Sequence, residues 1–140
     1  VNVKPGFAGP MAMLLAYHPG LQIGTTFGPS SNEGILPIGN MRGLAEAGAR
    51  IRLPSGGTLR NLLVEVGTNT LPGGGTCFVA VNVLGTASSL QLTIGSGTAD
   101  TYVIVATDVP ILSTQTMSFH VICAGTSGTV NIKQIAAELK

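Results

Sequence analysis

With 140 residues, the chain has the size of one globular domain, and its net charge of +1 makes it nearly neutral. Hydrophobic residues make up 44% of the sequence, whereas Asp, Glu, Lys and Arg together make up 9%, against an average of about a quarter in soluble proteins. Aromatic residues make up 4% of the sequence and Trp is absent, so the side chains that stack on nucleic-acid bases are few. The net charge of +1 also counts against a basic patch for nucleic acid and against the polybasic cluster that binds anionic lipids.

The scarcity of charge predicts that much of the surface is buried against other protein molecules. Mixed charges normally keep small domains apart in solution, and a net charge of +1 gives almost no repulsion between copies. The longest apolar run, residues 11–17, is far shorter than the roughly 20 residues that cross a bilayer, and the start of the chain does not resemble a secretory signal. We therefore expect a homo-oligomer that binds neither nucleic acid nor membranes.

The first 34 residues are rich in Gly and Pro, and we predict that they form an extended N-terminal arm. Proline presets an extended φ, so a segment with prolines at positions 5, 10, 19 and 29 can lie across another surface at a small cost in entropy. Residues 11–17 are predicted to form a strand, either of the same subunit or added to a neighbour. Five residues of the arm are expected to make apolar contacts with the neighbour: Phe7, Met11, Met13, Leu14 and Leu15.

Residues 35–140 are predicted to form an all-β body, an antiparallel jelly roll or β-sandwich. Short β-like runs are separated by Gly-rich turns at intervals of roughly 8 to 14 residues, which is the spacing of such folds. We expect seven or more strands, in which alternate residues point inward, as Leu90, Leu92 and Ile94 do between Gln91 and Thr93. Residues 77–83 are apolar on both faces, which predicts a central strand. A helix of at most two turns is expected at residues 43–49.

The two cysteines, Cys77 and Cys123, each lie in a predicted strand. Neighbouring strands can bring such positions within bonding range, so a disulfide is possible, but two buried free thiols are the simpler interpretation, because Cys is often a small core residue. Cysteines this far apart do not have the spacing of a zinc site, and we expect no metal.

Few residues could support catalysis, and we predict that the chain is not an enzyme and has no cofactor. His18 lies in a predicted turn and His120 in a predicted strand, so each is interpreted as structural. Residues 73–75 are three glycines, but no Lys and no helix follow them, so they indicate a hairpin rather than a phosphate-binding loop. A small hydrolase would require His120 to lie with Asp and Ser side chains in one pocket.

Three arginines lie within eleven residues, at Arg50, Arg52 and Arg60. In a chain with so few charges, this concentration favours an interface with carboxylates, because Arg is enriched at protein interfaces. A solvated strand face is the alternative. The carboxylates available within or between subunits are Glu33, Glu46 and Glu65.

Residues 55–140 resemble a jelly-roll domain of the virion surface that occurs in tailed-phage head-decoration and fibre proteins. The resemblance depends on four stretches: residues 57–62 (GTLRNL), 78–83 (FVAVNV), 90–94 (LQLTI) and 100–102 (DTY). The composition is also similar to that of the trimeric, tumour-necrosis-factor-like heads of spore-surface glycoproteins. Where the family often has Asn-Gly at a hairpin, this chain has Leu84-Gly85. The resemblance implies a jelly roll, a tendency to trimerise and a structural role on a particle exterior.

The function expected from the sequence is therefore that of a capsid decoration or cement protein. It would bind the major capsid protein or other shell subunits on the outside of a virion, as a homotrimer. The alternative is a receptor-binding or glycan-binding head of a phage fibre or another surface appendage, but no shaft-forming repeat precedes the body.

Overall fold

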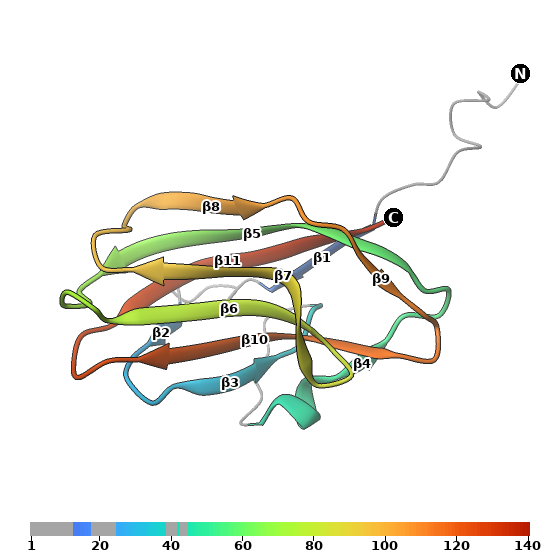
Figure 1. Cartoon of the computed structure of the whole chain (residues 1–140), viewed down its shortest axis with the longest axis horizontal. Helices are drawn as coiled ribbons and strands as arrows, with labels where there is room; N and C mark the ends of the chain where they lie inside the picture. The colour runs from blue at the N-terminus through green and yellow to red at the C-terminus, as the bar shows by residue number, and fades with distance from the viewer. Residues whose placement is uncertain (1–12, 18–24, 39–41, 43–44) are drawn as a thin grey trace, which may run out of the picture.

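Two antiparallel β-sheets pack face to face in a computed structural model of the chain (Figure 1). The structure describes residues 13–17, 25–38, 42 and 45–140. This arrangement confirms the predicted all-β sandwich and is jelly-roll-like in its strand order, because strands adjacent in space are mostly distant in sequence.

One sheet, here called sheet A, has six strands in the described part of the chain: β1 (Met13–Tyr17), β2 (Thr25–Phe27), β5 (Gly57–Asn69), β8 (Thr101–Val105), β9 (Val109–Ile111) and β11 (Val130–Leu139). Its order is β1-β11-β5-β8, with β2 also paired to β11 and β9 to β5. The long strands β5 and β11 therefore form the middle of the sheet.

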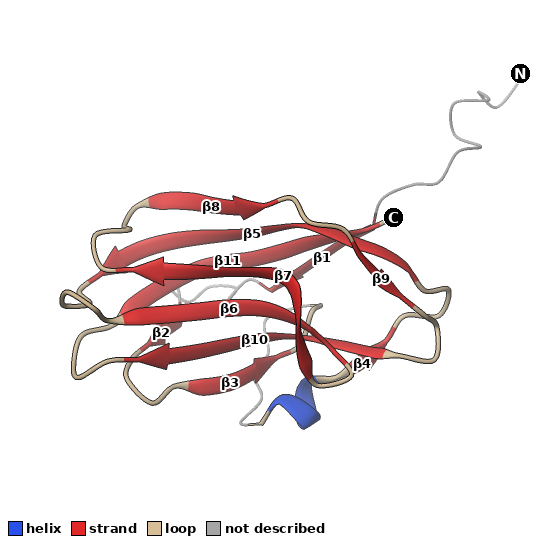
Figure 2. Ribbon diagram, in the orientation of Figure 1, coloured by secondary structure: helices blue, strands red, loops and turns tan. Residues whose placement is uncertain are grey.

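The other sheet, sheet B, has five strands in the same described part: β3 (Asn32–Ile35), β4 (Ile51–Arg52), β6 (Thr76–Val83), β7 (Thr86–Gly95) and β10 (Thr116–Ala124). Its order is β3-β10-β6-β7, with β4 also paired to β10. Figure 2 shows a single helical turn beside these strands, the 3₁₀ turn η2 (Glu46–Ala49). The short helix predicted at residues 43–49 is thus one 3₁₀ turn where the structure describes it.

The inward residues of both sheets follow the predicted alternation. In β7, Leu90 and Ile94 are fully buried and Leu92 nearly so, whereas Gln91 and Thr93 between them are exposed. In β6 the outward residues Ala80 and Asn82 are buried as well as the inward ones, which confirms a central strand. The apolar side chains of the two inner faces form one continuous core.

Three stretches of the predicted N-terminal arm belong to the body. β1 and β2 pair with β11, and β3 pairs with β10 of the same chain. Leu15 and Phe27 are fully buried in the core and Tyr17 almost fully, which explains why these stretches remain on their own subunit. The boundary at residue 34 is therefore wrong for them, while residues 1–12 and 18–24 lie outside the described residues.

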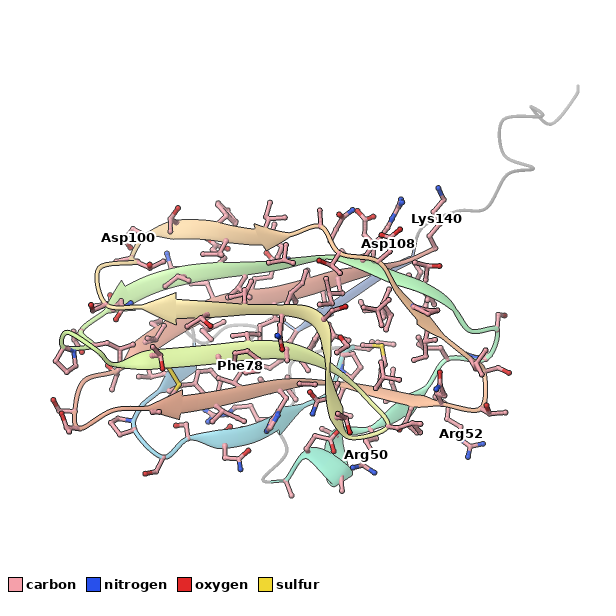
Figure 3. The ribbon with its side chains drawn as sticks, in the orientation of Figure 1. Arg50, Arg52, Phe78, Asp100, Asp108 and Lys140 are labelled. Atoms are coloured by element: carbon pink, nitrogen blue, oxygen red, sulfur yellow. A yellow bond between two sulfur atoms is a disulfide. The ribbon has the colours of Figure 1, made fainter. Side chains whose placement is uncertain are left out.

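The cysteines are bonded to each other. Cys77 on β6 lies directly opposite Cys123 on β10, and their Cα atoms are 4.0 Å apart. The bond faces the core, because both residues are buried, and it is visible as a yellow link in Figure 3. The structure therefore has the disulfide, and the interpretation as two free thiols, which the sequence favoured, is wrong.

Candidate interaction surface

The outer face of sheet A has an open hollow of about 360 Å³. Four adjacent strands contribute the eight residues that line it: Leu14, Asn61, Leu63, Tyr102, Ile104, Gln134, Ala136 and Glu138. We call this set the sheet A hollow.

Cross-strand pairing places the apolar residues of the hollow in a row. Ala136 of β11 lies opposite Leu63 of β5, which lies opposite Ile104 of β8. The outermost apolar side chains remain accessible: Leu14 is 63%, Tyr102 60% and Ile104 59% exposed. Adjacent exposed apolar side chains of this kind are characteristic of binding surfaces rather than of free protein surface.

A β-bulge in β5 forms the polar border of the hollow. The pairing of β5 with β11 shifts there, and Asn61 has a left-handed φ of 54°. The extra residue allows Leu59 and Leu62, three positions apart, both to be fully buried. It also turns Arg60 and Asn61 to the same outer side, where both donate hydrogen bonds to Glu138 Oε2, at 3.3 and 3.0 Å. The carboxylate at this border is thus already bonded.

A second hollow, of about 440 Å³, lies near the other end of β11 and is polar. Its lining combines three threonines with one acid, one amide and one base: Thr26, Thr68, Asp100, Thr129, Asn131 and Lys133. The outer side of sheet A therefore changes from apolar to polar along β11.

The outer face of sheet B differs because a segment of the chain covers part of it. Gly34 in β3 allows η2 to approach closely, since a β-carbon there would overlap the backbone of Glu46. The fully buried Ser118 donates a hydrogen bond to Glu46 Oε1 at 2.6 Å, and Arg50 bonds Oε2 at 2.7 Å. Burial alone would raise the pKa of Glu46, but these two hydrogen bonds outweigh it, and the pKa is lowered.

His120 lies on the same outer side of β10, two residues from Ser118. Its Nε2 is 2.6 Å from Asn32 Oδ1 on the neighbouring β3. Desolvation lowers the pKa of His120, although the charge of Glu46 acts in the opposite direction. In the described part of the chain, Ser118 is thus bonded to a carboxylate and His120 to an amide, rather than to each other.

The structure separates the three arginines that were expected at one interface. Arg50 and Arg52 lie near η2 and β4, at the edge of the sandwich in Figure 3, whereas Arg60 lies on sheet A. Arg50 is paired with Glu46 and Arg60 with Glu138. Exposed Arg52 has no ion pair with the described residues.

The apolar residues predicted to contact a neighbour also have different positions. Phe7 and Met11 lie outside the described residues. Met13 is 43% exposed and Leu14 lines the sheet A hollow, but Leu15 is fully buried in its own core. The expectation that Leu15 contacts a neighbour is therefore wrong, because alternate residues of β1 point to opposite faces.

Apart from Leu14, the sequence does not single out the residues of the sheet A hollow, including its four other apolar residues, Leu63, Tyr102, Ile104 and Ala136. A signal was present, because these residues lie in runs that are apolar at consecutive positions, such as residues 102–105 (YVIV). A strand that is apolar on both faces is normally covered on both.

Comparison with known proteins gives no match, either to a family model or to a curated protein. In the ranges that the structure describes, we find no group of three or more His, Cys, Asp or Glu side chains able to hold a metal ion. These ranges also contain no helix with the length and hydrophobicity of a membrane span. His18 lies outside them.

Proposed function

We propose that the chain is a non-catalytic structural subunit that decorates the outside of a protein shell as a homotrimer. The observation that carries this proposal is the sheet A hollow. Complete burial of an exposed leucine or isoleucine side chain is favourable by about 1.5 to 3 kcal/mol, so contact with another protein surface would stabilise the chain.

The border of the hollow supports a protein partner. Asn61, Gln134 and Glu138 surround the apolar centre, and an apolar centre with a polar border is the usual anatomy of a protein interface. The low charge of the chain adds to this, because copies repel each other weakly. In a trimer the hollow of each subunit would meet a different surface of its neighbour.

The shell and the trimer are the parts of the proposal that depend on the resemblance of residues 55–140 to virion-surface jelly rolls. The major capsid protein is the expected partner, and the capsid exterior the expected location. Electron microscopy of the native particle, with an antibody against the chain, tests this part. Antibody found inside the particle, or on no particle at all, would contradict the expected location.

Self-association is tested by the mass of the purified protein in solution. We expect about three times the 14.2 kDa of one chain. Ile104→Lys places a charge in the hollow and should give a folded monomer. Thr93→Lys, on the exposed outer side of β7, is the matched control and should leave the mass unchanged. A wild-type monomer at all concentrations, or an Ile104→Lys variant of unchanged mass, would reject the role of the hollow.

A role of the N-terminal arm in attachment is tested by removing residues 1–12. The deletion must stop there, because β1 contributes Leu15 and Tyr17 to the core. We expect a folded body that no longer remains on the particle. Full occupancy of the particle by the shortened chain would contradict an attachment role.

A glycan-binding head is the second candidate, and Tyr102 is the observation that favours it. The ring is 60% exposed, and Tyr102 pairs across the sheet with Glu65, so stacking and hydrogen bonding to a sugar could occur together. A glycan array with wild type and Tyr102→Ala distinguishes the two functions. Specific binding that the variant loses would favour the head over the decoration protein.

A further inference from the structure

A carboxylate without an ion partner lies beside the apolar centre of the sheet A hollow. Glu65 is in β5, directly opposite Tyr102 of the hollow. Its neighbours Val64 and Val66 are fully buried, so alternation puts the Glu65 side chain on the outer face, where it is half-buried. Glu65 has no ion pair with the described residues. A partner that fits the hollow therefore carries an apolar side chain and, close to it, a positive charge.

The first twelve residues of the chain have that combination. They lie outside the described residues, but their sequence, VNVKPGFAGPMA, contains one ionisable side chain, Lys4, and one aromatic side chain, Phe7. Pro5 and Pro10 lack a backbone donor, which disfavours regular pairing of this segment along a sheet edge. Their fixed φ also lowers the entropy that an extended segment loses on binding. The composition therefore favours side-chain contacts on the face of a sheet.

The spacing of Lys4 and Phe7 matches the spacing of the hollow and Glu65. An extended chain rises roughly 3.3 Å per residue, so the two residues of the segment are about 10 Å apart along it. In β5, Leu63 and Glu65 are two positions and therefore about 7 Å apart. A Phe7 ring placed over Leu63 and Ile104 would thus leave the long Lys4 side chain within reach of the Glu65 carboxylate.

The direction of β1 favours binding to a neighbouring copy over binding to the same body. Met13, the first residue of β1, pairs with Leu139, and the hollow starts at the next residue, Leu14, and extends the other way along β11. Residues before Met13 would have to reverse direction at once to enter their own hollow. A neighbouring hollow requires no such reversal. The six residues from Phe7 to Met13 can span about 20 Å, which is enough to reach an adjacent copy.

We propose that residues 1–12 of one copy bind in the sheet A hollow of the next copy. The Phe7 ring packs on Ile104 at the centre of the hollow. The Lys4 ammonium pairs with the Glu65 carboxylate at its border. This inference rests on the proposed homotrimer and names the surface that the hollow meets. Segment and hollow are different surfaces, so each contact is heterologous, and three such contacts close a ring.

Mixing two variants tests the exchange. Phe7→Asp has an intact hollow and a defective segment, Ile104→Lys has the reverse, and each alone should be a monomer. Mixed one to one, they should form a dimer of about twice the 14.2 kDa chain mass, because one intact segment meets one intact hollow. Phe7→Leu is the matched control and should remain a trimer. A mixture that stays monomeric would overturn the inference.

The same masses separate this inference from the proposed function. If Phe7→Asp remains a trimer while Ile104→Lys is a monomer, the inference is wrong and the trimer through the hollow stands. If the wild type is a monomer at all concentrations, the proposed trimer is wrong and the inference falls with it.

A crosslink identifies the contact directly. Benzoylphenylalanine in place of Phe7 should crosslink, on illumination, to β5 or β8 of another copy, which digestion and mass spectrometry would locate. The product should have the mass of two or more chains. A crosslinked product with the mass of one chain would place the segment in its own hollow and overturn the exchange.

Charge reversal tests the ion pair. Glu65→Lys and Lys4→Glu should each weaken trimer formation by about threefold to fivefold, because each places two like charges together. The double variant restores opposite charges and should return to within about twofold of the wild type. Lys133→Glu, in the polar hollow, is the matched control and should leave trimer formation unchanged. A double variant no better than the single ones would overturn the assigned pair.

Discussion

The outer faces of the two sheets differ in how far the chain itself covers them. Sheet B is partly covered by its own chain, because η2 lies over it and Glu46 bonds the buried Ser118. Sheet A leaves Leu14, Tyr102 and Ile104 exposed around a hollow. The covered face is thus completed by local polar contacts, whereas the apolar side chains of the open face are left exposed.

The two sheets also differ in covalent bonding, because the disulfide joins two strands of sheet B. Its removal should cause the largest loss of stability. The disulfide joins β6 to β10 in sheet B and closes a loop with a sequence separation of 46. Replacing Cys77 and Cys123 together by Ala should lower the free energy of unfolding by about 4 kcal/mol, from the entropy of the opened loop. Urea unfolding of both proteins measures the change. A loss below about 1 kcal/mol would contradict this account of the stability of sheet B.

In sheet A, the corresponding test of stability is at the bulge around Asn61. Asn61→Val should cost about 2 kcal/mol, because a β-branched residue is strained at positive φ and the bond to Glu138 is lost. Asn61→Gly keeps the backbone and should cost about half as much. Arg60→Ala, which removes only a partly exposed ion pair, should cost less than about 1 kcal/mol. Thermal unfolding ranks the three, and an equal loss for Val and Gly would exclude backbone strain as the cause.

The smallest expected effect is a loss of stability in acid, caused by His120 and Glu46 on the outer side of sheet B. The pKa of His120 is lowered from its ordinary value of 6.5 and that of Glu46 from 4.5, so the unfolded chain binds more protons in both ranges. Stability is therefore lost as the pH falls below about 6.5 and again below about 4.5. His120→Gln should remove the first step in Tm and Glu46→Gln the second. A constant Tm between pH 7 and pH 4 would contradict the assigned shifts.

Much of the fold was predictable because alternation depends only on neighbouring residues. The inward sets of β7 and β10 follow directly from period two, and the glycine turns mark the strand ends. The edge strands β1, β2 and β3 were harder to place. A short strand between Gly and Pro residues pairs equally well with its own body or with a neighbour, and only the burial of Leu15 and Phe27 decides between them.

The interaction surface was less predictable for a geometric reason. The hollow contains residues from four strands that are up to 124 positions apart, Leu14 and Glu138, and their proximity depends on the strand order. A strict alternation of inward and outward residues would put Arg60 and Leu62 on the same side of the sheet. The bulge at Asn61 instead leaves Arg60 on the outer side and Leu62 in the core. The pairing of Cys77 with Cys123 required the same knowledge of which strands are adjacent.

The position of β11 has a consequence for the order of folding. This strand comes last among the described elements, yet it pairs with β1, β2 and β5 and so joins the two halves of sheet A. During synthesis, β1 and β5 leave the ribosome without the strand that belongs between them. Sheet A can then close only after residue 139 has emerged, so the apolar surfaces of the nascent chain remain open to aggregation or chaperone binding until that moment.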